Sequence, residues 1–248
     1  MHGHPQVTIA VPSYNQGRFL DAALTSIFSQ ALPVEVYVMD GGSTDNSIEI
    51  IRKWENQLAG WRSHQDKGQS AAINEGIAKG KAEFVCWLNS DDWFLPGSLQ
   101  HLIDTLNKHP ETPAVYGKAW NFLEEKQATK PLWVEDFNVR RLALRCIIAQ
   151  PASLIRRSAW EQIGGLDENL HMAMDYDLWW RLYREFGPLV LLDEFVAVSR
   201  EHALTKTKNN RRQQYQEAMS IVKRHHGRLP LKWGLAQPYK VCFKSLVR

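Results

Sequence analysis

Two adjacent carboxylates follow one of the most apolar runs of the chain. Asp91 and Asp92 stand in "WLNSDDWFLPG", directly after residues 83–89, which have the composition of a buried strand. Neighbouring acids repel each other, and when they are partly desolvated they require a cation or several hydrogen-bond donors. A divalent metal supplies that cation, because Mg²⁺ or Mn²⁺ binds one or two carboxylates while substrate phosphates complete its shell. The simpler alternative is an Asp that caps the helix predicted at 96–107, beside a solvated neighbour.

The elements that must position these acids alternate between two kinds. β-Branched runs at 7–11, 34–40 and 83–89 alternate with amphipathic runs at 18–30, 47–56 and 69–80, and a short strand is predicted near 61–65. This order predicts an α/β fold whose mainly parallel central sheet is flanked by helices, with ligands beyond the carboxyl ends of the strands. The second half is less regular. Its predicted helices lie at 140–150 and 175–187, and its predicted strands at 113–120, 188–193 and 195–201.

Asp40 is a second candidate for binding chemistry. It ends the run at 34–40 and precedes "GGSTDNS", where Asp45 is well placed to cap the next helix. Asp40 lies too early to cap, and a carboxylate at a strand end can accept hydrogen bonds from a base or a ribose. The glycines do not form GxGxxG and no P-loop is present, so the sequence does not indicate a dinucleotide-binding fold.

Four segments, taken in order, resemble one known family. "VPSYNQGRFLDAALTSIFSQ", "VEVYVMDGGSTDNSIEII", "DKGQSAAINEGIAKGKAEFVCWLNSDDWFLPGSL" and "GGLDENLHMAMDYDLWWRL" are similar to the family-two inverting glycosyltransferases of bacterial cell-surface polysaccharide synthesis. The resemblance runs from Val7 to His202. It implies the Rossmann-like GT-A fold, with a glycosyltransferase domain at 1–202, whose nucleotide-sugar half is 1–95 and acceptor half 96–202, and a basic helical extension at 203–248.

The resemblance also implies a role for individual residues. It gives the general base to Asp175 and the divalent metal, Mn²⁺ or Mg²⁺, to Asp92, Asp91 and His202. The implied contacts to the nucleotide sugar are Pro12, Tyr14, Asn15, Asp40, Asp66, Asn74 and Asp91. Weaker expectations for the acceptor or sugar concern Trp93, Asp177 and Arg200. For several of these residues a structural role is an open alternative: Asp177 as a helix-start acid, His202 as a surface histidine and Trp93 as a core side chain.

Three departures from the family pattern bear on these roles. Asn89 stands where many relatives have an acid, which removes one possible metal ligand. Gly41 replaces a frequent Asp, and Met174 replaces a Glu that would raise the pKa of Asp175. The Gln-x-x-Arg-Trp pattern of processive relatives is absent, which favours addition of a single sugar.

The resulting hypothesis is an inverting, metal-dependent, non-processive glycosyltransferase. Its donor would be a nucleoside-diphosphate sugar, with a UDP-sugar favoured, and its acceptor a glycan or a lipid-linked saccharide. A metal would offset charge on the leaving diphosphate, and a carboxylate would take the proton of the attacking hydroxyl. The alternatives are a sugar-phosphate nucleotidyltransferase, which should have a Gly-rich basic loop in place of "PSYNQGRF", and a non-enzymatic basic binding module.

The charge of the chain is concentrated at one end. Residues 203–248 hold eleven of the 30 Lys and Arg residues but one of the 27 acids. Basic residues interleaved with Trp233, Tyr239, Phe243 and Leu246 suit an anionic membrane surface, and a solvated helical appendage is the alternative. No nucleic-acid motif is present, so no nucleic-acid partner is expected. The absence of a signal peptide and the three scattered cysteines predict a cytoplasmic protein, peripheral on the inner membrane face if the tail binds lipid.

Overall fold

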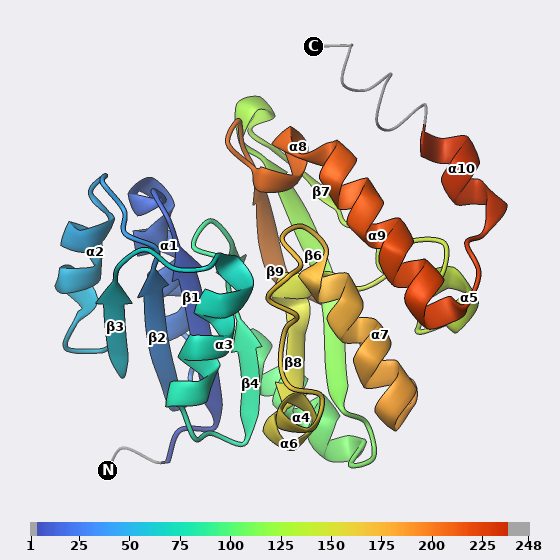
Figure 1. The fold of residues 1–248 in the computed structure, drawn as a ribbon. Helices are drawn as coiled ribbons and strands as arrows, with labels where there is room; N and C mark the ends of the chain where they lie inside the picture. Colours follow the sequence, from blue (N-terminus) through green and yellow to red (C-terminus); the bar gives the residue numbers. More distant parts are fainter. Residues whose placement is uncertain (1–3, 238–248) are drawn as a thin grey trace.

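The computed structural model of this protein describes residues 4–237, and its centre is one nine-stranded sheet (Figure 1). The strands lie in the order β3-β2-β1-β4-β8-β6-β9-β5, and β7 pairs with the outer part of β6. Their bounds are β1 Val7–Ser13, β2 Val34–Asp40, β3 Gly60–Ser63, β4 Phe84–Trp87, β5 Trp93–Phe94, β6 Ala114–Leu123, β7 Ala128–Pro131, β8 Ser153–Arg156 and β9 Val190–Glu201.

The two halves of the sheet have different strand directions. β1 pairs in parallel with both β2 and β4, and β2 pairs in parallel with β3, as the βαβ pattern predicted. From β8 onward the sheet is mixed, because β8 is antiparallel to β4 and β6 while β9 is parallel to β6. The carboxyl ends of β1 to β4 therefore meet along one edge, and β9 brings a much later part of the chain to the same edge.

Helices cover both faces of the sheet (Figure 1). Those longer than one turn are α1 Gly17–Phe28, α2 Ser47–Trp54, α3 Gln69–Lys79, α4 Ser98–Lys108, α6 Arg157–Gln162, α7 Met174–Phe186, α9 Arg211–His226 and α10 Leu231–Gln237. The short ones are α5 Val139–Leu142, α8 Lys206–Asn209, η1 Glu124–Lys126 and η2 Gln150–Ala152. No helix between residues 4 and 237 is long and apolar enough to cross a membrane.

The core follows from the alternation of side chains along the strands. Val7, Ile9 and Val11 of β1 point to one face, where they pack with α1, α2 and α4. Ala10 points to the other face, where Trp87 of β4 belongs to a second cluster with α3, α6, α7 and α9. Because the side-chain period of a strand is two, one strand serves both layers, and the sheet is buried on each side.

The predicted helix at 140–150 is wrong beyond its first turn. The helix α5 ends at Leu142, and the following segment is irregular until η2. Ile148 packs in the cluster on one face of the sheet, whereas the next residue, Ala149, packs in the cluster on the other face. Adjacent residues of a helix cannot serve two opposite layers in this way, so the chain passes through in an extended conformation.

The predicted strands at 188–193 and 195–201 are one strand, β9. The acidic pair Asp193–Glu194, which separates the two apolar runs, lies at a bulge where the register between β6 and β9 shifts. A bulge accommodates extra residues without ending the pairing. The charged residues therefore interrupt the hydrophobic pattern but not the strand.

The C-terminal helix α9 belongs to the core rather than to a solvated appendage. Its apolar face buries Tyr215, Ala218, Ile221 and Val222 in the same cluster as α7. Trp233 of α10 is buried as well, and its Nε1 donates to the carbonyl of Ala143 at 2.8 Å. Tyr239, Phe243 and Leu246, which the sequence suggested for membrane contact, lie outside the described residues.

Candidate active site

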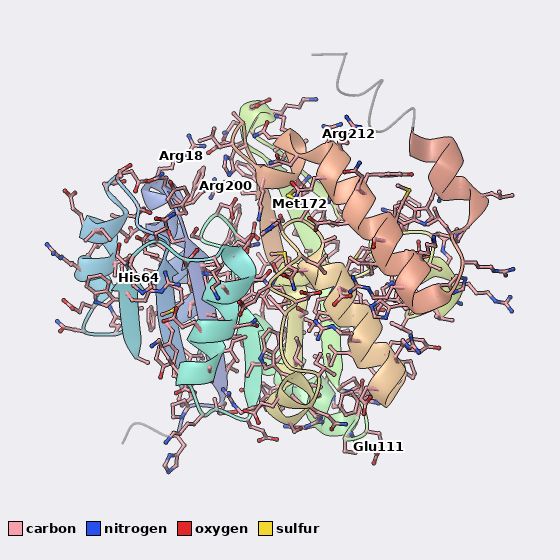
Figure 2. All side chains as sticks on the ribbon, in the orientation of Figure 1. Arg18, His64, Glu111, Met172, Arg200 and Arg212 are labelled. Atoms are coloured by element: carbon pink, nitrogen blue, oxygen red, sulfur yellow. The ribbon has the colours of Figure 1, made fainter. Side chains whose placement is uncertain are left out.

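The predicted site residues gather where the carboxyl ends of β1 to β4 meet β9. Figure 2 shows Arg200 at this meeting point, between the N-terminal strands and the C-terminal helices. Arg200 lies near the end of β9, and its backbone N–H donates to Oδ1 of Asp92 at 2.9 Å. Its Nε donates to the backbone carbonyl of Asp91 at 3.1 Å. One residue of the last strand thus holds both members of the acidic pair.

Asp92 is buried, and protein donors occupy both of its oxygens. Oδ1 accepts from Arg200, and Oδ2 accepts from the side-chain amide of Asn89 at 3.1 Å. Burial and, to a smaller extent, the nearby charge of Asp91 raise the pKa of Asp92 to about 8. An acid in place of Asn89 would add a third carboxylate to this cluster, whereas the amide donates to Asp92. Asn89 therefore compensates for the close acids.

Asp91 is more open and contacts the buried His202. Their Oδ2 and Nε2 atoms are 3.1 Å apart, and Nδ1 of His202 accepts from the backbone N–H of Leu204 at 3.2 Å. Because Nδ1 is an acceptor, the ring proton of neutral His202 is on Nε2, which donates to Asp91. The prediction that Asp91 and His202 lie together agrees with this geometry, and the alternative of a surface histidine does not.

Asp91 fits a divalent cation better than Asp92 does, because its carboxylate is partly exposed and keeps free acceptor positions. His202 could ligate through Nε2 only if its proton moved to Nδ1, and Nδ1 already accepts from the N–H of Leu204. The described residues hold no cluster of three or more His, Cys, Asp or Glu arranged for a metal. A site with one or two carboxylate ligands is still usual for Mg²⁺, because phosphates and water complete its shell. The expectation that Asp92 is a direct ligand disagrees with its hydrogen bonds.

Trp93 takes part in a cage around Arg200 rather than in an open stacking platform. The guanidinium carbon of Arg200 lies 4.7 Å from the ring centre of Trp93, 4.6 Å from that of Phe19 and 5.5 Å from that of Phe122. Cation–π contacts of this kind fix the arginine that holds Asp91 and Asp92. The predicted sugar contact for Trp93 is therefore not supported by the geometry.

The Asp40 carboxylate is fully buried and its hydrogen bonds are made within the protein. It accepts from the backbone N–H groups of Gly42 and Ser43 and from the hydroxyls of Ser43 and Ser63, at 2.5 to 3.0 Å. Gly42 has a φ of 85°, a left-handed conformation that favours glycine. Asp40 thus shapes the turn after β2, and the structure disagrees with the expected direct contact to a base or ribose.

Asp66 is placed to take over that contact. Its side chain is 17% exposed, with Oδ1 accepting from Gly68 N–H and Oδ2 from Arg62. A Cβ atom on Gly41 would lie 3.6 Å from Asp66 Oδ2 and 3.4 Å from the ring of Tyr14. Gly41 therefore leaves space between Asp66 and Tyr14, whose ring is 62% exposed. An exposed aromatic face beside a carboxylate suits stacking and hydrogen bonding of a nucleobase.

Tyr14 and Asp66 form a surface that we call the nucleoside ledge. Two of the other predicted nucleotide residues, Pro12 and Asn15, shape the strand and loop beside it. Pro12 is buried in β1 beyond the end of β4, where its missing N–H leaves no gap in the ladder. Asn15 has a left-handed φ of 53° and accepts from the N–H of Thr44 at 2.8 Å, so it ties the loop after β1 to the loop after β2. Asn74 lies elsewhere. Its amide bonds both the N–H and the carbonyl of Leu166 at 2.9 Å, which corrects the expected nucleotide contact.

A cavity of about 590 Å³ opens on the C-terminal side of Arg200. Asp175 and Tyr176 at the start of α7, Cys146, and residues of α9 and α10 line it; Met172, labelled in Figure 2, is on the same wall. Burial raises the pKa of Asp175 to about 6, although the Tyr176 N–H donates to it at 2.8 Å. Burial therefore raises this pKa without an acidic neighbour at position 174, where this chain has Met174.

Asp177 faces away from this cavity. It is fully buried between α7 and α9, where Oδ2 accepts from Arg181 at 2.6 Å and Oδ1 lies 2.8 Å from Nε2 of His225. These partners lower its pKa against the effect of burial. The carboxylate therefore holds α9 on α7, and the expected acceptor contact of Asp177 stays a prediction.

Sequence reasoning missed Arg145, which lines the cavity and whose guanidinium carbon lies 4.5 Å from the ring centre of Trp133. Trp133 is 59% exposed but is not among the residues that line the cavity. Arg145 falls in the irregular segment between β7 and β8, inside the range of the mistaken helix at 140–150.

Comparisons with known proteins agree with this arrangement. An uncharacterised glycosyltransferase of Rickettsia felis is 28% identical over 209 residues, which are 80% of this chain and 35% of the relative. The chain thus spans about a third of that relative's length. Staphylococcus aureus TarS, solved with UDP-GlcNAc, is similar in fold with a TM-score of 0.70 at 18% identity, over 96% of this chain and 71% of TarS. A Pyrobaculum calidifontis mannosyltransferase, solved with GDP-Man and Mn²⁺, has a TM-score of 0.70 at 18% identity, over 98% of this chain and 74% of its own.

A family model covers most of the chain as well. The description "Glycosyl transferase family 2" matches residues 8–164, which include Asp40, Asp91 and Asp92. This match extends over more than half of the sequence and agrees with the GT-A-like architecture. The chain therefore belongs to glycosyltransferase family 2.

Proposed function

We propose that this protein is an inverting glycosyltransferase that moves one sugar from a nucleoside-diphosphate sugar to a hydroxyl of a glycan or lipid-linked acceptor. One observation carries the proposal: Arg200 holds the Asp91–Asp92 pair on one side and lines the cavity that contains Asp175 on the other. The residues proposed to bind the diphosphate and the candidate base, Asp175, therefore lie on two sides of the same residue, Arg200. Family membership supports this reading over a nucleotidyltransferase or a non-enzymatic module.

The donor would lie across the strand ends with its base on the ledge of Tyr14 and Asp66. Its diphosphate would reach Asp91, whose carboxylate keeps free acceptor positions and would hold Mn²⁺ or Mg²⁺. A bound divalent cation would offset the charge that develops on the leaving diphosphate. UDP-GlcNAc and GDP-Man are the donors in the two structural neighbours, and we propose a UDP-sugar here.

Asp175 would act on the acceptor. The acceptor hydroxyl loses its proton to the Asp175 carboxylate as its oxygen forms a bond to the anomeric carbon, and the bond to the diphosphate oxygen breaks on the opposite side. A single displacement of this kind inverts the anomeric configuration. Burial of Asp175 supports the role, because a base whose pKa is near the working pH both ionises and accepts a proton.

Donor-binding calorimetry tests this proposal. We expect UDP to bind to the full chain more tightly with Mn²⁺ than without it, and Asp91→Asn to remove the effect of Mn²⁺. Asp104→Asn, which changes an exposed carboxylate of α4, is the matched control. Equal binding with and without the metal, in the parent chain and in Asp91→Asn, would reject the metal site. Failure of UDP and other nucleoside diphosphates to bind at all would reject the function.

A further inference from the structure

The residues that line the cavity beside Asp175 include more cations than acids. Arg200 and Lys208 also line it, but each has an acidic partner, Glu124 at 3.6 Å and Glu125 at 2.9 Å. Arg145, Arg211 and Lys232 make no side-chain hydrogen bond or ion pair with any residue in the described part of the chain.

Arg145 is the most informative of the three. Its Nε is buried and donates to no acceptor within residues 4–237. The nearest acid, Glu135, is already bound by two nitrogens of Arg141, at 2.5 and 2.6 Å. A buried donor of a cation that lacks an acceptor is costly, so such a group in a native protein commonly has a ligand or ion as its partner. Burial also lowers the pKa of Arg145, as expected for a cation short of counter-charge.

The two acids that line the cavity, Asp175 and Glu201, have neither an Arg nor a Lys as hydrogen-bond partner within the described chain, and Glu201 accepts from Asn121 at 3.1 Å. Two acids against five lining cations leave an excess of positive charge, which an anionic ligand in the cavity would offset. A phosphate group carries up to two charges and several acceptor oxygens, which suits two forked guanidiniums and an ammonium. A carboxylate carries one charge and fits three cations less well.

We propose that the acceptor of this enzyme carries a phosphate group, bound by Arg145, Arg211 and Lys232 while its sugar hydroxyl faces Asp175. This inference rests on the proposed function and adds the chemical class of the acceptor. The cavity volume of about 590 Å³ is sufficient for a pyranose with a phosphate. Tyr215 and Trp233 supply apolar surface on the same wall, so the phosphate could belong to a soluble saccharide or to a lipid-linked one.

The test separates the acceptor cavity from the donor site. The full chain is first saturated with UDP and Mn²⁺, and calorimetry then measures binding of α-glucose 1-phosphate, farnesyl phosphate, glucose and glucuronate. We expect the two phosphates to bind at least about tenfold more tightly than glucose or glucuronate. Preference for glucose 1-phosphate would indicate a soluble phosphosaccharide, and preference for farnesyl phosphate a lipid-linked one; either supports the proposal.

Substitutions then assign the binding to these cations. Arg145→Gln and Arg211→Gln should each weaken phosphate binding about tenfold or more while UDP binding stays unchanged. Arg212→Gln, which alters the exposed neighbour on α9 (Figure 2), should change neither. Because Arg145 is partly buried, Arg145→Gln can lose phosphate binding by unfolding. Arg211→Gln is therefore the second variant, and an unchanged melting temperature shows that its loss of phosphate binding does not come from unfolding.

Several results would overturn the proposal. One is binding of glucose or glucuronate as tightly as both phosphates. Another is a loss of phosphate affinity in Arg212→Gln as large as that in Arg145→Gln. Either outcome would show that the cavity does not select phosphate. Failure of the first step, in which UDP and Mn²⁺ are bound, would instead count against the proposed function and leaves the phosphate measurement to be made on the chain alone.

Discussion

The acidic residues of the site differ in how far the protein itself satisfies them. Asp40 accepts four hydrogen bonds from the protein, and both oxygens of Asp92 are occupied. Asp91 and Asp175 each accept one hydrogen bond from a neighbouring donor. Carboxylates that keep free acceptor positions can meet a ligand, whereas saturated ones fix the backbone. This difference separates binding residues from supporting residues.

Asp175→Asn should strongly reduce sugar transfer while leaving donor binding intact. The amide is nearly the same size but cannot accept the proton of the acceptor hydroxyl, so we expect a loss of about 10²-fold or more in kcat. Transfer assays with product detection, beside UDP calorimetry, measure the two effects. Full activity in the variant would place the base at another residue.

The pH profile should reveal the same carboxylate. Because burial raises the pKa of Asp175 to about 6, the base is protonated below that pH and ionised above it. We therefore expect kcat/KM to fall about tenfold per pH unit below about 6 and to be level toward pH 7 and above. The residual activity of Asp175→Asn should lack this acidic limb, and a limb that persists there would assign it to a different group.

The two adjacent acids should respond differently to substitution. Asp92→Ala removes the acceptor of a backbone N–H and an amide in a buried place, so we expect it to lower the free energy of unfolding by about 1–3 kcal/mol. Asp91→Asn should leave that stability within about 0.5 kcal/mol and lose metal-dependent UDP binding. Chemical denaturation and calorimetry distinguish the two, and equal destabilisation by both would refute the division of roles.

At the level of elements, α9 positions the start of α7. The Glu217 carboxylate accepts from the backbone N–H groups of His171, Met172 and Ala173 at 3.3, 2.8 and 3.0 Å. These three residues lead directly into the turn that carries Asp175. His225 and Asp177 join the same two helices further along. The basic C-terminal helix is thus a structural support of the candidate base.

Glu217→Ala should therefore weaken both stability and transfer. Three backbone donors lose a charged acceptor, for an expected cost of about 1–3 kcal/mol in the free energy of unfolding. Glu185→Ala, an exposed acid on α7 that accepts from Gln162, should cost less than about 0.5 kcal/mol. Urea denaturation measures both. A Glu217 variant as stable as the Glu185 variant would show that this contact does not hold the helix.

The elements also show which parts of the structure the sequence could predict. The strand and helix periods in residues 7–89 are regular, and the structure follows them closely, with β1, β2, α3 and β4 within a few residues of the predicted ranges. The segment at 140–150 was predicted to be a helix because its apolar residues have the pattern of a buried helix. An extended segment that crosses between two buried layers has a similar pattern. Asp193 and Glu194 misled because a bulge is set by the pairing of β6 with β9, which sequence spacing does not contain.

The site was predictable in outline, again for a physical reason. Strand-end acids mark the edge at which a parallel sheet binds ligands, so position and family pattern were enough to propose Asp91, His202 and Asp175 as site residues. Whether an acid faces a ligand or a protein donor depends on long-range partners. Asp92 meets Arg200 and Asp177 meets His225, at separations of 108 and 48 residues in sequence. No local pattern indicates such partners.

On the scale of the whole molecule, Arg212 at the start of α9 lies on the same side of the molecule as Arg200 of the site (Figure 2). We predict that exposed Arg212 and Lys223 draw this side toward anionic lipid. Arg212→Glu with Lys223→Glu should weaken binding to phosphatidylserine vesicles by about tenfold or more, since each basic residue contributes about 1 kcal/mol at such a surface. Sedimentation with vesicles at low and physiological salt measures the change.

The control for this experiment carries the same change in charge elsewhere. Lys81 and Lys108 are exposed and precede β4 and β6, at the amino edge of the sheet. Lys81→Glu with Lys108→Glu should leave vesicle binding nearly unchanged if orientation matters. An equal loss in both double variants would mean that net charge alone, and not a membrane-facing side, governs the interaction.

The hold of Arg200 on Asp91 and Asp92 also sets an order of events during synthesis. The nucleoside ledge is built from residues 12 to 68, which leave the ribosome first, whereas the strand that fixes the acidic pair ends at Glu201. Domains form as their N-terminal parts emerge, but this seat for the diphosphate needs a partner made more than a hundred residues later. We expect a nascent chain to hold a nucleoside before the acids proposed to bind the diphosphate are fixed in place.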